Sequence, residues 1–427
     1  MNPSAAEPSY NTTDAGVIPQ DWQALPLADF CSTYSGGTPS TSRSDYYGGD
    51  IPWIASGDLN QGIIEDVNGR ITAAGLQNSS AKLVEANTLL MALYGATAGI
   101  PAITKISGAI NQAVLAIKPR GADPEYLYAW LAHNKDRIID TYTQGGQPNL
   151  SGEIVRKIVV PLPGKTEQRQ ISSHLSDVTS LISALERSIT KKQSIKHGMM
   201  QELLTGRTRL PGFTKQWEDV LLGQHVTYVK TIALSRAQLD EESPCRYLHY
   251  GDIHTTRDIR LAAATRDMPR AAAALVGAAG FLKVGDLVFA DASEDPDGVG
   301  KSIEITSVPA EGVVPGLHTI AARFDKKVLA DGFKAYLQFM PDLRNSLLRL
   351  AAGTKVLATT RSYISSITLH LPDVEEQIAI AQILHDVDDE IDALQHRLLK
   401  ARAMKQGVMQ ELLTGRTRLQ PVSESSL

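Results

Sequence analysis

Apolar side chains recur at a coiled-coil spacing in two stretches of the chain. In both stretches the steps between apolar positions are 4, 3, 4, 3 and 4 residues, which lays them along one stripe of an α-helix. The pattern predicts two long helices, each of about 40 residues and ~60 Å long at roughly 1.5 Å per residue. We call this stripe the seam; it consists of Ile171, Leu175, Val178, Ile182, Leu185 and Ile189 in the first helix and Ile380, Leu384, Val387, Ile391, Leu394 and Leu398 in the second.

Boundary residues support both predicted helices. Proline stands just before each helix, at Pro163 and Pro372, and glycine stands just past each end, at Gly206 and Gly415. Proline before a helix and glycine after it are typical stop signals. The two helices are therefore expected to begin and end at matching points.

Lysine interrupts the seam at the same place in the two helices, at Lys196 and Lys405. Two interpretations stay open. Either the stripe faces solvent at these positions, or the lysines form polar contacts that fix the register of the helices.

The two helical stretches are copies of one another. The eleven residues MQELLTGRTRL occupy 200–210 and recur without a change at 409–419. At the same offset, Glu167-Gln168 falls on Glu376-Gln377, and the seam residues fall on one another. A register held over the whole stretch indicates an internal duplication.

Looser matches link the segments that precede the helices. Trp22 falls on Trp217, Gly57-Asp58 falls on Gly251-Asp252, and both pairs lead into short apolar strands. The offset between matched pieces drifts, so loops of different length separate them. These patterns predict a mixed α/β (α+β) domain before each long helix. Further helices are expected near PEYLYAWLAHNKDRIID and DGFKAYLQFMPDLRNSLL.

Composition adds little that changes this picture. The net charge of −5 weakly disfavours a nucleic-acid partner, but only the clustering of basic residues on one face would decide the question. Two cysteines that are far apart are typical of a reducing compartment. Without a signal peptide or a long apolar run, we expect a cytoplasmic protein.

Motifs for catalysis are weak. DPDGVGKS at 295–302 follows an apolar strand and contains Gly-Lys-Ser. In a phosphate loop, backbone N–H groups bind the phosphates. Here the aspartates at the start of the segment would repel a phosphate, and the proline has no N–H to donate. His249 and His254 are spaced as H-x4-H, which without further ligands is a poor metal site. We therefore expect neither a catalytic residue nor a metal in this chain.

Glycine, hydroxyl and amide residues fill the loops of the first half, at 34–50, 93–99 and 142–153. The corresponding loops of the second half have different sequences. Such side chains read base edges and hold phosphates, although ordinary solvent loops contain them as well. The informative pattern is that the scaffold repeats while these loops differ.

Taken together, these marks resemble the specificity subunit of type I restriction-modification systems. The resemblance rests on a leucine-proline pair, a Glu-Gln pair and a long heptad helix that ends in LLTG, all present twice. It covers residues 17–420. The first half keeps the family's YGATAG-like loop at 94–99, whereas the second departs from it with the acidic insertion EDPDG. The marks are Leu162-Pro163, Glu167-Gln168 and Leu204-Thr205-Gly206, then Leu371-Pro372, Glu376-Gln377 and Leu413-Thr414-Gly415.

The resemblance implies two target recognition domains, each reading half of a bipartite DNA site, and two antiparallel spacer helices with pseudo-twofold symmetry. It implies two methyltransferase subunits and motor-nuclease subunits as partners, which would bind S-adenosylmethionine and ATP with Mg²⁺; no cofactor is expected in this chain. The expected boundaries are 1–163 and 207–372 for the recognition domains, 164–206 and 373–419 for the helices, and 420–427 for a tail.

Rigid helices of this length can hold two readers about one turn of B-DNA (~34–36 Å) apart. A protein-interaction scaffold and a self-contained restriction-methylation enzyme stay as alternatives. The predicted DNA-binding residues are Arg43, Tyr46, Tyr47, Tyr94, Thr97, Gln147 and Asn149 in the first half, and His249, Tyr250, Arg257, Lys301, Lys355 and Arg361 in the second.

Overall fold

The computed structural model describes residues 9–143, 149–277, 279–293, 295–351 and 357–419. Two compact units make up the chain. Unit 1 contains the residues up to Glu186 and those from Arg397 onward, whereas unit 2 is the single stretch Arg187–His396. Each unit therefore contains one globular domain and one part of each long helix.

A five-stranded sheet forms the centre of unit 1. All neighbouring strands are antiparallel except the last two, which are parallel. Every residue of β9 and β10, two of the three inner strands, is buried. The strand order is β4 (Cys31–Ser35), β12 (Val114–Pro119), β9 (Leu89–Ala92), β10 (Pro101–Thr104) and β6 (Ile63–Ile64).

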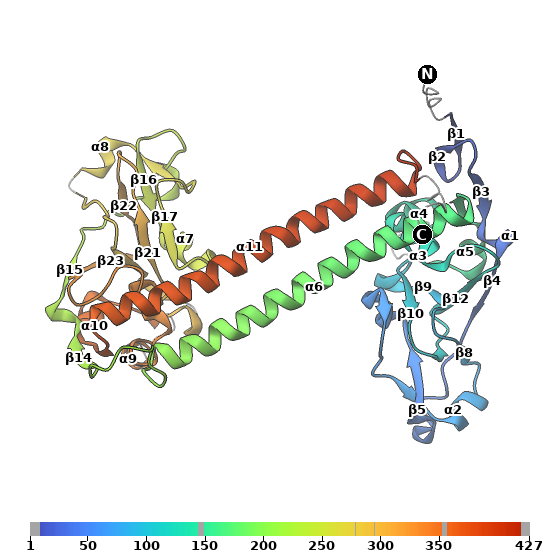
Figure 1. The fold of residues 1–427 in the computed structure, drawn as a ribbon, viewed down its shortest axis with the longest axis horizontal. Coiled ribbons are helices and arrows are strands. Elements are labelled where there is room, and N and C mark those ends of the chain that lie inside the picture. The colour runs from blue at the N-terminus through green and yellow to red at the C-terminus, as the bar shows by residue number, and fades with distance from the viewer. Residues whose placement is uncertain (1–8, 144–148, 278, 294, 352–356, 420–427) are drawn as a thin grey trace. The chain divides into compact units, whose positions relative to one another are not determined.

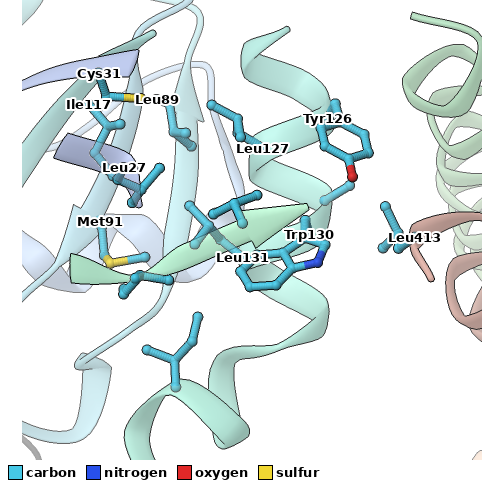
Figure 2. Packing of buried hydrophobic residues seen from close by; sticks show 14 of the residues in the cluster. Leu27, Cys31, Leu89, Met91, Ile117, Tyr126, Leu127, Trp130, Leu131 and Leu413 are labelled. Atoms are coloured by element: carbon cyan, nitrogen blue, oxygen red, sulfur yellow. The ribbon is translucent and has the colours of Figure 1, made fainter. Parts of the chain in front are cut away.

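Helix α3 (Pro124–His133) packs against this sheet. It begins where the Asp123 carboxylate accepts hydrogen bonds from two backbone N–H groups of the first turn, a typical N-cap. Figure 2 shows Leu127, Trp130 and Leu131 of α3 in the same apolar cluster as Leu89. Burial of these large side chains is the main stabilising contribution to unit 1.

Smaller elements complete unit 1. A second sheet has the order β7 (Arg70–Ile71), β5 (Tyr47–Ile54), β11 (Gly108–Ile110) and β8 (Lys82–Val84). The other elements are the pairs β1 (Tyr10–Thr13) with β2 (Gly16–Pro19) and β3 (Gln23–Pro26) with β13 (Val159–Leu162), and the helices α1 (Leu27–Phe30), α2 (Ala73–Gln77), α4 (Lys135–Tyr142) and α5 (Gly152–Lys157).

Unit 2 repeats this plan. Its five-stranded sheet has the corresponding strand order and again ends in a parallel pair. The duplication read from the sequence therefore extends to the topology. The order is β15 (Val226–Tyr228), β23 (Thr319–Phe324), β19 (Leu287–Ala290), β21 (Ser302–Ser307) and β17 (Arg260–Ala262), with a second sheet of β18 (Arg270–Ala271), β16 (Cys245–Leu248) and β22 (Val313–Pro315).

The remaining elements of unit 2 are short. One of the predicted helices is divided here, because Pro341 lacks the N–H that a continuous helix requires; a 3₁₀ helix at Lys334–Phe339 precedes α9 (Pro341–Ala351). The others are β14 (Glu218–Leu221) paired with β25 (Thr368–Leu371), β20 (Ala292–Ser293) paired with β24 (Leu357–Ala358), α7 (Tyr250–Thr255), α8 (Ala273–Val276) and α10 (Arg361–Ser366).

Both predicted long helices are present. Helix α6 (Lys165–Leu203) has 39 residues and α11 (Val374–Leu413) has 40, so the prediction of their length is confirmed. Gly206 and Gly415 follow them with φ of 68° and 69°, the left-handed conformation that glycine adopts after a helix.

Within each unit the two helices pack antiparallel, because the start of one shares a cluster with the end of the other. Leu175 near the start of α6 packs in the cluster of Leu412 near the end of α11 in unit 1. Leu203 and Leu384 do the same in unit 2, and Figure 1 shows the helices side by side in both units. None of the described helices is long and apolar enough to cross a membrane.

Candidate nucleic-acid interface

The start of α6 is tied to the end of α11 in unit 1. The carboxylate of Glu167, in the first turn of α6, accepts a hydrogen bond from Trp22 Nε1 at 3.2 Å and two from the Arg418 guanidinium at 2.8 and 2.9 Å. Arg418 also donates to Asp21 at 2.8 and 2.7 Å. These two carboxylates raise the pKa of Arg418. We call Trp22, Glu167 and Arg418 the joint of unit 1.

Unit 2 contains the same joint. Glu376, in the first turn of α11, accepts from Trp217 Nε1 at 3.2 Å and from Arg209 at 2.7 and 2.6 Å. The carboxylate of Glu376 is 1% exposed. Hydrogen bonding by Glu376 raises the pKa of Arg209. Such bidentate, charge-assisted pairs are among the stronger polar contacts in proteins.

The joints explain the repeated eleven residues. Each copy supplies the arginine of one joint and the glycine that follows one helix. A Cβ atom on Gly206 would lie 3.3 Å from the Trp217 ring, and one on Gly415 would lie 3.1 Å from the Trp22 ring. The two copies therefore close different units in the same way.

The glutamine that follows each joint glutamate connects the long helix to its globular domain. Gln168 accepts from the backbone N–H of Asp123 at 2.9 Å, and Gln377 accepts from that of Ala330 at 2.9 Å. Both amides also donate to the carbonyl of the proline before the helix. These buried contacts fix the angle at which each helix leaves its domain.

The predicted seam residues all lie on the covered side of the helices. Ile171, Leu175, Leu185, Ile189, Ile380, Leu384 and Ile391 are buried, and Val178, Ile182, Val387, Leu394 and Leu398 are half-buried.

The two seam lysines differ in their surroundings. Lys196 forms an ion pair with Asp388 at 2.5 Å in unit 2. Asp388 also accepts from the Tyr336 hydroxyl at 3.0 Å, and that hydroxyl contacts His385 Nδ1 at 2.7 Å. This network supports the register-fixing interpretation at Lys196. Burial lowers the pKa of Lys405. In the other copy of the repeat, the residue that corresponds to Asp388 is Thr179, which has no carboxylate.

In unit 1, three predicted interface residues form one loop. Arg43 pairs with Asp45 at 2.7 Å and its guanidinium lies 4.6 Å from the centre of the Tyr46 ring. Tyr46 is buried, so its ring supports Arg43 from below. The hydroxyl of Tyr47 donates to the carbonyl of Pro39 at 2.6 Å. The guanidinium of Arg43 is 55% exposed and is the group in this loop that can reach a phosphate.

A second group lies at the end of β9. Tyr94 and Asn149, which are far apart in the sequence, form an antiparallel bridge. Thr97 donates its hydroxyl to the Tyr94 carbonyl at 3.2 Å, and the Tyr94 ring is 42% exposed. The structure thus brings these three predicted residues together. Gln147 lies outside the described residues.

In unit 2, His249 and Tyr250 lie at the start of α7. His249 is the N-cap: its Nδ1 accepts from the Gly251 N–H at 3.1 Å. Its ring centre lies 4.5 Å from that of Tyr250, which in turn lies 5.4 Å from that of His318. Burial lowers the pKa of His249, and nearby Arg236 adds to this effect.

Lys301 joins the same region from within. Its ammonium donates to the carbonyls of His254 at 2.6 Å and Thr256 at 3.0 Å, and burial lowers its pKa. The lysine therefore holds the end of α7 in place instead of extending into solvent. Asp295, at the start of the same loop, accepts from the Gly298 N–H and so occupies a donor that a phosphate loop would offer.

The last predicted residues lie outside the helix α7. Arg361 begins α10, and its guanidinium lies 5.5 Å from the Tyr228 ring centre. Arg257 is exposed in the turn after α7. Lys355 lies outside the described residues. The contacts described above are all within the protein, so the role of these residues in binding DNA stays a prediction.

The sequence analysis missed Arg236, which lines a cavity together with His249 and several carboxylates. The available signal was its residue type, an arginine in a polar loop. Within the described ranges, no three His, Cys, Asp or Glu side chains gather as metal ligands would.

Comparison with known proteins agrees with this architecture. Residues 19–197 match the family described as the type I restriction modification DNA specificity domain. The chain is 34% identical over 185 residues to the MjaIX specificity subunit of Methanocaldococcus jannaschii, a match that covers 41% of this chain and 42% of that relative. It is 24% identical to the MjaVIII specificity subunit of the same organism over 94% of each chain.

Solved structures show the same fold. The S subunit of a type I restriction-modification system from M. genitalium has a TM-score of 0.59 at 13% identity, covering 94% of this chain and 97% of that chain. A structure described in terms of complex assembly of the type I system has a TM-score of 0.55 at 15% identity, covering 94% and 99%. Residues 19–197 are thus similar to a DNA specificity domain. Over its whole length the chain is similar to specificity subunits of type I restriction-modification systems, which confirms the predicted resemblance.

Proposed function

We propose that this chain is the non-catalytic DNA-recognition subunit of a type I restriction-modification complex, with each unit reading one half of a bipartite target. One observation carries the proposal. The two units share strand order, joint and helix ends, whereas the loops that contain the predicted interface residues differ. Two readers on one scaffold are what two different half-sites require.

The chemistry of contact follows from the residue types. Exposed Arg43 and Arg257 would contact phosphates and set the position on the duplex, while loop side chains such as Tyr94 and Asn149 would contact base edges. The partners in this proposal are double-stranded DNA, two methyltransferase subunits and restriction-translocase subunits. S-adenosylmethionine and ATP with Mg²⁺ would be bound by those subunits.

The proposal is tested by co-expressing the chain with a type I methyltransferase subunit from the same genome and mapping N6-methyladenine. We expect a split motif of two short defined halves around an undefined spacer. A complex that forms but leaves DNA unmethylated would favour the interaction scaffold. Methylation by this chain alone would favour a self-contained enzyme.

The long helices offer a second test. Repeating a segment near the end of α6 adds length to a helix that continues from one unit into the other. We expect the defined halves of the motif to stay the same and the undefined spacer to change. A motif with unaltered spacing would contradict the role of the helices as a spacer.

A further inference from the structure

A cavity of about 340 Å³ lies beside α7 in unit 2. Its wall combines one buried ring, one exposed guanidinium and several carboxylates. Hydrogen-bond donors and acceptors are therefore present within a single concave surface, which is typical of a site that fixes the orientation of a polar ligand. The polar residues of the wall that matter here are Arg236, Glu241, His249, Asp252 and Asp267.

His249 contributes a donor of fixed orientation. The residue is only 9% exposed, and its Nδ1 accepts from the Gly251 N–H, so the ring proton is on Nε2. Among the described residues, Nε2 forms no hydrogen bond. Since His249 lines the cavity, this N–H is available to a ligand that brings an acceptor.

The charged groups of the wall fall into two sets. Asp240 and Asp252 are already used: Asp240 accepts from the backbone N–H groups of Glu242 and Ser243, and Asp252 accepts from the His249 backbone N–H at 3.0 Å. Arg236, Glu241 and Asp267 are exposed and form no ion pair within the described part of the chain. One guanidinium and two carboxylates are thus available to a ligand.

This set of groups matches one base pair in particular. Arginine donates to O6 and N7 of guanine, and a carboxylate accepts from N4 of cytosine. Resting on the proposed function, we infer that unit 2 reads a guanine–cytosine pair at the mouth of this cavity. Arg236 and His249 Nε2–H would donate to guanine, and Glu241 or Asp267 would accept from cytosine.

Unit 1 lacks these groups at the corresponding position. Ala55 stands where unit 2 has His249, although Asp58 accepts from the Ala55 N–H at 2.8 Å just as Asp252 does from His249. Arg43 is already paired with Asp45. The shared capping geometry with different neighbours indicates that the reading groups belong to unit 2 alone.

The test uses the complex of this chain with its methyltransferase subunit and duplexes that contain each base pair at each motif position. We expect Arg236→Ala to reduce discrimination at one G·C pair by roughly 5- to 150-fold and to leave the other positions unchanged. His249→Asn keeps an acceptor for the Gly251 N–H but removes Nε2–H, and should relax the same pair to a smaller degree.

Volume-matched carboxylate variants complete the set. Of Glu241→Gln and Asp267→Asn, at least one should relax the cytosine side of that pair. Arg349→Ala, at an exposed position on α9, serves as the control and should change nothing. If Arg236→Ala lowers the melting temperature, the two carboxylate variants decide the question.

Failures of the two proposals are distinguishable. If the wild-type complex gives no bipartite motif, the proposed function fails and this inference fails with it. If the motif is bipartite but contains no G·C pair that the cavity variants relax, or if they relax an A·T pair instead, the inference alone is overturned.

Discussion

The joints of the two units are nearly identical, whereas the seams beside them have diverged. In both joints a tryptophan donates to a glutamate at 3.2 Å and an arginine donates to it twice. In the seam, Lys196 has Asp388 as its partner, but the equivalent Lys405 has Thr179 at that offset. The contacts that close a unit were kept, and those along the helix were free to change.

Charge separates the two parts of α11 further. The part in unit 2 contains only acidic charges, and the part in unit 1 is mainly basic. The two parts of α11 therefore offer surfaces of opposite charge to any binding partner. The acidic residues are Glu375, Glu376, Asp386, Asp388, Asp389, Glu390 and Asp392, and the basic ones are Arg397, Lys400, Arg402 and Lys405, accompanied by Glu411.

Breaking a joint should have the largest effect. Replacing Glu376 by Ala leaves Arg209 and the Trp217 N–H without their acceptor, and we expect a loss of about 3 kcal/mol in the stability of unit 2. Glu167→Ala should destabilise unit 1 by a similar or smaller amount, because Glu167 is 12% exposed and Glu376 only 1%. Urea unfolding measures the loss in the free energy of unfolding, and hydrogen exchange shows which unit has lost protection.

The control for the joint is Glu218→Ala, since Glu218 is exposed on β14. It should change the stability by less than about 0.5 kcal/mol. Loss of protection in both units from a single joint variant would contradict the view that each joint closes its own unit.

Exchanging the seam contacts should have a smaller effect. Asp388→Ala removes the acceptor of both Lys196 and Tyr336, which should cost about 2 kcal/mol. Thr179→Asp in unit 1 gives Lys405 the carboxylate that Lys196 has, and we expect a gain of about 1 kcal/mol. Thr179→Asn is the uncharged control. Equal stability of the Asp and Asn variants would show that Lys405 forms no pair.

The smallest expected effect is a pH dependence of unit 2 that comes from His385. Burial, helped by Arg260, lowers the pKa of His385 to about 4 from 6.5. Because the folded-state pKa lies below the unfolded one, the contribution of His385 is complete above pH 6.5 and is lost as the pH falls toward 4. Hydrogen exchange at pH 7 and pH 5 should show loss of protection in unit 2.

The offset places Ser176 of unit 1 where unit 2 has His385, which suggests the matched variant. His385→Ser should flatten the pH dependence of unit 2, whatever it does to the stability at pH 7. An unchanged slope in this variant would assign the effect to another group of unit 2, such as His249, whose pKa burial also lowers.

The long helices were predictable because their pattern is local. Seam spacing, the flanking prolines and the following glycines all lie within the segments that they define. The same duplication predicted a second domain like the first, and the strand orders agree. The two shorter predicted helices are each divided in the structure: α3 ends at His133 before α4 begins at Lys135, and Pro341 begins α9 after a 3₁₀ helix.

The joints were not predictable in the same way. Their parts were visible as repeated residues, but Arg418 and Glu167 are 251 positions apart, and nothing local says that they meet. Likewise, the burial of Tyr46 and the inward contacts of Lys301 depend on neighbours from other elements. Residue type indicated an interface, whereas only tertiary packing shows which of those side chains is free to reach a ligand.

The division of the chain also orders its synthesis. Unit 2 is one continuous stretch, so all of its residues have been made once His396 is added to the chain. Unit 1 begins first but needs Arg418 to close. The domain that is translated first is therefore the one whose residues are completed last.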